Sequence, residues 1–156
     1  MKVIYCFIIT LLIVSVKINA QTYSFYGWLY EGEGTYLSVK FNINENKKQV
    51  LDTLLLLDTS INNFEVPKDE SVKSWKKVFD NSEASKVKII TYKYNDNNIS
   101  FLTEKLYEGP KTWLRLNFKG KIKGDKIDGI LKSDWCPEGN PKEIYTSKDK
   151  IIFYKD

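Results

Sequence analysis

The side chains that could carry out chemistry in this chain are few. Histidine is absent from all 156 residues, which excludes Ser-His and Cys-His nucleophiles and removes the commonest metal ligand. Asp128, Asp134 and Glu104 could in principle supply the carboxylate pair of a glycoside hydrolase, but acidic residues on strands and turns are usually solvated. The sequence has no phosphate-binding glycine loop and no calcium-loop spacing. We therefore predict a protein that is not an enzyme, with no catalytic residue, metal site or cofactor.

Aromatic side chains are the remaining candidates for binding. The chain contains four Trp, ten Tyr and eight Phe. Trp113 alternates with Leu114 and shares the polar face of its strand with Arg115, and a flat ring beside hydrogen-bonding groups suits a sugar or a protein partner. Trp28 and Trp135 are weaker candidates for the same role. Structural packing against a neighbouring strand, a helix or a barrel end is the alternative for each tryptophan.

These side chains must be positioned by secondary structure, and most of the sequence after residue 20 alternates between apolar and polar residues. Such a period of two is typical of strands with one buried and one wet face. We predict strands over 25–30, 37–43, 50–57, 87–94, 99–106, 114–122, 127–131, 143–147 and 150–154. Polar or glycine-bearing turns separate many of them, at 31–34, 45–48, 95–98 and 123–125. The run Leu54 to Leu57 does not alternate, so we expect cover on both of its faces.

One segment departs from this rhythm. Between Asp69 and Ser82, apolar residues recur at helical spacing, at Val72, Trp75 and Val78 with Phe79 beside the last, which predicts a short amphipathic helix. We expect it to pack over a barrel end or a sheet edge. The whole pattern favours an all-β fold, an antiparallel up-and-down barrel of about eight to ten strands with one inserted helix, although a sandwich has the same local signature.

The strand patterns also resemble a known family. The segments that carry the likeness are Phe25-x-Gly27-x-Leu29, Leu37-x-Val39-x-Phe41-x-Ile43, Leu57 to Ser60, Phe64-x-Val66, Ile99 to Leu102, and Gly120 to Leu131. They are similar to the small calycin-like, or lipocalin-like, β-barrel modules of exported bacterial proteins. The resemblance implies a barrel and transfers no catalytic residue. Residues 67–86 stand out as an insertion in that pattern.

Residues 1–20 read as a secretory signal peptide. Lys2 is followed by an apolar stretch from Val3 to Val16, and Ala20 provides a small residue at the expected cleavage position. This stretch of fourteen residues, broken by Thr10 and Ser15, is shorter than the roughly 17–25 residues that a membrane span needs. We predict export to the periplasm or beyond, a single domain over 21–156, and no membrane span after cleavage.

The net charge limits the classes of partner that are expected, and the cysteine content limits the possible disulfides. Loss of Lys2 and Lys17 reduces 24 Lys and Arg to 22 against 20 Asp and Glu, a net charge of only +2. A nucleic-acid partner is not expected at this charge, with Arg115 as the only arginine. Loss of Cys6 leaves Cys136 alone in the mature chain, so we expect no internal disulfide and a buried thiol.

Three functions are consistent with these observations. The leading hypothesis is a non-enzymatic binding module that holds a small, largely apolar ligand in the barrel or at its end. The second is surface recognition of a carbohydrate or protein partner through Trp113 and Arg115. The third is an inhibitor or immunity role through the loop from Cys136 to Pro141. No sequence feature favours this third role over the other two.

Overall fold

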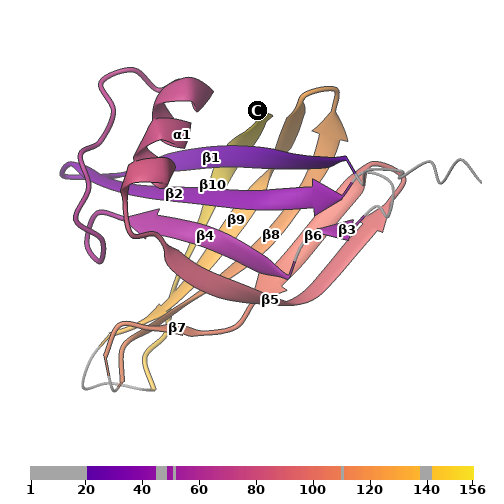
Figure 1. Cartoon of the computed structure of the whole chain (residues 1–156). Coiled ribbons are helices and arrows are strands. Elements are labelled where there is room, and N and C mark those ends of the chain that lie inside the picture. Colours follow the sequence, from indigo (N-terminus) through magenta and orange to yellow (C-terminus); the bar gives the residue numbers. More distant parts are fainter. Residues whose placement is uncertain (1–20, 45–48, 51, 110, 138–141) are drawn as a thin grey trace, which may run out of the picture.

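The computed structural model describes residues 21–44, 49–50, 52–109, 111–137 and 142–156 (Figure 1). The predicted signal peptide, the predicted turn at 45–48 and most of the loop from Cys136 to Pro141 lie outside the described residues. Within the described part of the chain, no helix is both long enough and apolar enough to cross a bilayer.

Eight antiparallel strands form a closed barrel, which confirms the predicted fold class. In chain order they are β1 (Thr22–Gly32), β2 (Thr35–Asn44), β4 (Thr53–Asp58), β5 (Ser85–Asn95), β6 (Asn98–Thr103), β8 (Trp113–Lys123), β9 (Lys126–Cys136) and β10 (Tyr145–Lys155). Each strand pairs with the next in this order, and β1 pairs with β10 to close the circle. Two short strands, β3 (Gln49–Val50) and β7 (Leu106–Tyr107), add to β2 and β8.

Several strand boundaries differ from those predicted. The strand β1 runs on to Gly32 through a register shift between Tyr30 and Gly32, so Glu31 belongs to a strand and not to a turn. The strand predicted over 50–57 is divided into β3 and β4. The two strands predicted over 143–147 and 150–154 form one continuous strand, β10, because β9 pairs with it without interruption from Trp135 to Lys126.

Tight turns connect the hairpins where the sequence placed them. Asp96 and Asn97 have φ values of 48° and 65° between β5 and β6, and Gly124 has a φ of 63° between β8 and β9. Asn, Asp and Gly tolerate this left-handed backbone better than other residues. The turn chemistry therefore fixes these two hairpins locally.

Phenylalanine rings fill much of the barrel interior. Phe41 lies 4.8 Å from Phe153 and 5.3 Å from Phe101, measured between ring centroids, and Phe118 lies 5.0 Å from Phe153. Room for these rings comes from inward-facing glycines: Gly120 faces Gly129 across β8 and β9. A Cβ atom on Gly129 would lie 2.5 Å from the Phe118 ring, so the glycines allow the wall to press onto the core.

The helix α1 (Val72–Asn81) confirms the predicted amphipathic segment, but it packs elsewhere than expected. Its N-cap is Ser71, whose side chain accepts a hydrogen bond from the Ser74 amide at 3.2 Å. The helix lies against the outer wall, over β1, and not over a barrel end or a sheet edge (Figure 1). Its buried Phe79 joins a second apolar cluster with Tyr26 and Leu57, which point outward from β1 and β4. Large apolar residues on these outer faces create a dry surface that the helix covers.

The leucines of β4 are covered on both faces, as the missing alternation predicted. Leu54 and Leu56 belong to the barrel core, whereas Leu57 is buried in the cluster under α1 with Leu55 packed against it. The barrel wall at β4 is therefore sandwiched between two apolar layers.

Candidate functional site

The structure places the four predicted binding residues in three different parts of the barrel. Trp28 lies on the outer wall beside the helix, where its ring stacks on Trp75 at 5.8 Å and on Tyr154 at 5.4 Å. Its Nε1 donates a hydrogen bond of 3.4 Å to Glu70. Trp28 therefore belongs to the aromatic layer that holds α1 in place, and it does not line the cavity described below.

Trp113 and Arg115 lie together on the outer face of β8, as the alternation predicted. Trp113 is only 6% exposed, and the ammonium of Lys105 lies 4.1 Å from the centre of its ring. Arg115 lies 5.8 Å from the same ring and donates a hydrogen bond of 2.9 Å to Asp134. A ligand that stacks on Trp113 must first displace Lys105.

Asp134 is the centre of this outer cluster. It accepts hydrogen bonds from Arg115 at 2.9 Å, from Lys132 at 2.8 Å and from Thr146 at 2.8 Å. Burial acts to raise the pKa of Asp134, but the hydrogen bonds from Lys132, Arg115 and Thr146 outweigh it and lower that pKa to about 2. The cluster is a charged clamp that joins β8, β9 and β10.

The other two carboxylates considered for acid catalysis lie apart from that clamp. Asp128 pairs with Lys123 at 2.6 Å on the exposed surface, near the turn between β8 and β9. Glu104 follows β6 and accepts a hydrogen bond of 3.2 Å from the Lys88 amide. Each carboxylate thus has a local structural contact.

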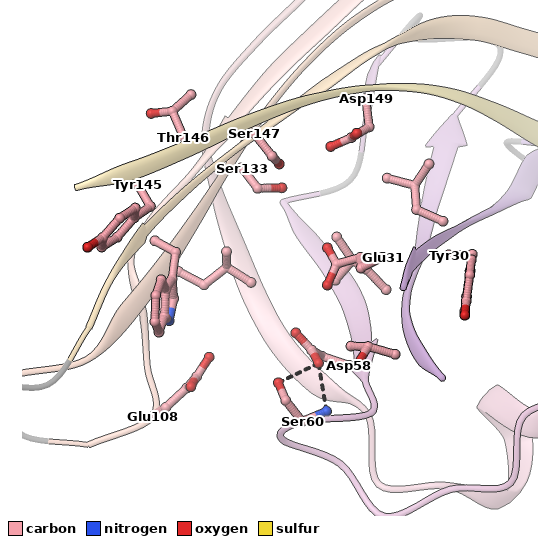
Figure 2. Close-up of a pocket in the computed structure, with 15 residues that line it drawn as sticks. Tyr30, Glu31, Asp58, Ser60, Glu108, Ser133, Tyr145, Thr146, Ser147 and Asp149 are labelled. Atoms are coloured by element: carbon pink, nitrogen blue, oxygen red, sulfur yellow. Dashed lines mark hydrogen bonds between the residues drawn. The ribbon is translucent and has the colours of Figure 1, made fainter. Parts of the chain in front are cut away.

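Trp135 is the one predicted residue that lines a substantial cavity. This cavity, which we call the end cup, has a volume of about 600 Å³ and opens at the end of the barrel where β1, β4 and β9 finish and β2, β8 and β10 begin (Figure 2). Leu29, Leu37 and Leu114 line its inner part, where it adjoins the core. Trp135 and Tyr145 form an aromatic pair at the mouth, 5.7 Å apart and 41% and 55% exposed.

Along four of the strands around the end cup, the inward-facing side chains become less apolar toward the open end of the barrel. Along β10 the inward positions run from Phe153 and Ile151 to Asp149 and Ser147, that is, from the packed core to the open end. The inward positions of β9, β4 and β1 follow the same course, ending at Ser133 and Trp135, at Asp58, and at Glu31. The interior is therefore apolar and filled along much of its length, and polar and open at one end.

Four carboxylates line the end cup: Glu31, Asp58, Glu108 and Asp149. Figure 2 shows them turned toward a common space from different parts of the wall. Asp58 is 7% exposed, and its Oδ1 accepts hydrogen bonds from the amide and the hydroxyl of Ser60, at 2.8 and 2.6 Å. The tight loop after β4 thus holds Asp58 in a fixed position.

The surroundings of two cup carboxylates, Glu31 and Glu108, disfavour their ionisation. Burial raises the pKa of Glu31, and the negative charges of Asp58 and Asp149 raise it further. Burial also raises the pKa of Glu108, with a further contribution from Asp58. Four carboxylates and no Lys or Arg line the end cup, so negative charge is concentrated there.

Sequence reasoning missed these acidic residues, although a signal for them exists. Glu31 was assigned to a turn, and Asp149 fell in the gap between two predicted strands. Extending the inward parity of β10 from Phe153 through Ile151 to Asp149 places that carboxylate inside the barrel. Polar residues on inward positions at one end of several strands are the pattern that marks the end cup.

Cys136 is buried at the end of β9, which confirms its predicted burial. No group of three or more Cys, Asp or Glu residues is placed to hold a metal ion among the residues that the structure describes. Comparison with known proteins gives no family model, curated protein or solved structure that matches the chain.

Proposed function

We propose that this protein is an exported, non-enzymatic binding module that holds a small molecule in the end cup. The observation that carries the proposal is the cavity of about 600 Å³ at the end of a barrel whose core is filled by aliphatic and phenylalanine side chains. Small-molecule sites are typically concave, about 300–1,000 Å³ in volume, with apolar walls and a few polar groups. Leucines on the inner wall and the exposed ring of Trp135 offer apolar contact, as a partly apolar ligand requires.

The calycin-like relationship forms part of the same proposal. An eight-stranded, closed, up-and-down antiparallel barrel with a cavity at one end supports it. In such a barrel the hydrogen-bonded wall is a rigid frame, and the residues at the mouth determine what binds. In this proposal the phenylalanine-containing core stabilises the barrel, and the end cup binds the ligand.

Export is proposed from the sequence pattern of residues 1–20. The test is the intact mass of the protein recovered from the periplasm or the medium of a bacterial culture. We expect an N-terminus at Gln21. A protein that retains Met1 contradicts cleavage.

A cup-filling variant tests the binding site. Ser147 is exposed and lines the end cup from β10, so Ser147→Trp places an indole in the cavity without disturbing the core. The matched control is Lys148→Trp, because the next residue of the same strand is exposed on the outer face. We expect hits from a calorimetric or ligand-observed NMR fragment screen to lose affinity in Ser147→Trp and to keep it in Lys148→Trp. Equal binding to both variants contradicts the site.

A further inference from the structure

The charge of the end cup is unbalanced. Glu31, Asp58, Glu108 and Asp149 line it, and neither Lys nor Arg does. Within the described residues, the ion pairs of this barrel involve Asp128, Asp134 and Asp156, and none of the four cup carboxylates takes part. Two cations of the nearby wall, Arg115 and Lys132, both bind Asp134 on the outer face.

This imbalance has an energetic cost in the empty barrel. Asp58 is almost fully buried, and its charge and that of Asp149 oppose ionisation of Glu31. Charges of one sign in a partly desolvated cavity repel each other more strongly than in water. A cation that enters the end cup relieves this repulsion, whereas an anion adds to it.

The arrangement suits an organic cation better than a metal ion. No three of the acidic residues that the structure describes are grouped closely enough to ligate a metal, so their charge is spread over the wall. The aromatic pair of Trp135 and Tyr145 stands at the mouth, and the face of an aromatic ring attracts an ammonium or guanidinium group. The inner wall is apolar, at Leu29, Leu37 and Leu114, and can accept a hydrocarbon body.

We infer that the end cup selects small organic cations, namely amines or guanidines that carry an apolar or aromatic body. This inference rests on the proposed binding function and adds the class of ligand. The carboxylates supply the charge preference, the aromatic pair supplies cation–π contact, and the leucines bury the hydrocarbon. Selectivity against anions follows from the same four carboxylates.

Three matched probes test the inference by isothermal titration calorimetry at neutral pH and low salt. They are 2-phenylethylamine, 2-phenylethanol and 3-phenylpropionate, which share a phenyl ring and differ in charge. We expect the amine to bind roughly tenfold or more tightly than the alcohol, and the carboxylate to bind most weakly, from the Coulomb energy of a charge near several carboxylates. Raising the ionic strength should weaken binding of the amine and leave the alcohol nearly unchanged.

Glu31→Gln removes one cup charge with little change in shape, and Glu33→Gln is its matched control. Glu33 is exposed in the turn after β1 and does not line the end cup. We expect Glu31→Gln to weaken the amine roughly threefold to tenfold and Glu33→Gln to leave it unchanged. The loss cannot come from unfolding, because removal of a carboxylate that its neighbours repel does not destabilise the barrel.

The outcomes separate this inference from the proposed function. Equal affinity for the amine and the alcohol, with both lost in Ser147→Trp, overturns the charge selectivity and leaves the binding function intact. Absence of binding by all three probes overturns both. Displacement of the amine by micromolar calcium or magnesium chloride overturns the preference for organic cations in favour of a metal site.

Discussion

Replacing Asp134 with Asn removes the charge that Arg115 and Lys132 share on the outer wall. The hydrogen bonds to Asp134 lower its pKa from 3.8 to about 2 in the folded protein. This difference corresponds to about 2 kcal/mol of unfolding free energy, since one pKa unit is worth about 1.4 kcal/mol. Because the folded pKa is the lower one, the contribution is fully present above about pH 5 and is lost as the pH falls through 4 toward 2.

Urea denaturation followed by tryptophan fluorescence measures the effect. Asp134→Asn should lose about 2 kcal/mol at pH 7, and the gap between variant and wild type should narrow steadily at pH 4 and pH 3. Asp128→Asn is the control, because its ion pair with Lys123 is exposed, with side chains 40% and 60% accessible, and should change stability by at most about 0.5 kcal/mol. A gap that stays constant with pH, or an equal loss in both variants, refutes the assignment of a buried charged clamp.

Three further predictions concern the core, the helix layer and the end cup. Gly129→Ala should destabilise the barrel by about 1–3 kcal/mol in the same denaturation assay, because its Cβ would meet the Phe118 ring, whereas Gly109→Ala should cost nothing since no atom lies within 4 Å of its added Cβ. Trp75→Ala should lower the unfolding free energy by about 3–5 kcal/mol. Trp75→Phe should lower it much less, because the buried Nε1 has no hydrogen-bond partner among the described atoms. Equal losses in the two variants would show that the indole nitrogen matters. Glu31→Gln should raise the unfolding free energy at pH 7 and not at pH 3. Burial, followed by the charges of Asp58 and Asp149, raises the pKa of Glu31, so its ionised form destabilises the folded protein at neutral pH. Thermal melts at the two pH values test the sign.

The strands and the helix could be predicted because their signals are local. Alternation across Leu37 to Ile43 reports only which residues share a face, and that is a property of the strand itself. Trp75 and Phe79 fall on one side of any helix that contains them. Closure into a barrel is not local, because a sandwich built from the same strands has the same alternation, and the pairing of β1 with β10 decides between the two.

The end cup could be predicted only in part, for a physical reason. The sequence predicts Trp135 only as a weaker binding candidate, with packing at a barrel end as the alternative, and Trp135 lines the cavity. Lys105, which contacts the Trp113 ring, lies outside the strand that carries Trp113 and outside any shared periodicity, so a sequence pattern does not report this contact. Asp58 and Asp149 are separated widely along the chain, and only the closed barrel brings their charges into one cavity.

The seam between β1 and β10 has a kinetic consequence. Only Phe25 with Lys155 and Tyr26 with Tyr154 are paired there, whereas β10 is paired with β9 along ten residues. The contacts across the seam join the most distant strands of the barrel, and contacts of large sequence separation form slowly. Until they form, β1 and β10 each present an unpaired edge that can add a strand from another molecule. Folding at high protein concentration should therefore favour dimers joined through this seam. Two contacts of Asp156 oppose such dimers by holding β10 closed in the monomer: its amide donates to the Ser24 carbonyl, and its carboxylate pairs with Lys76.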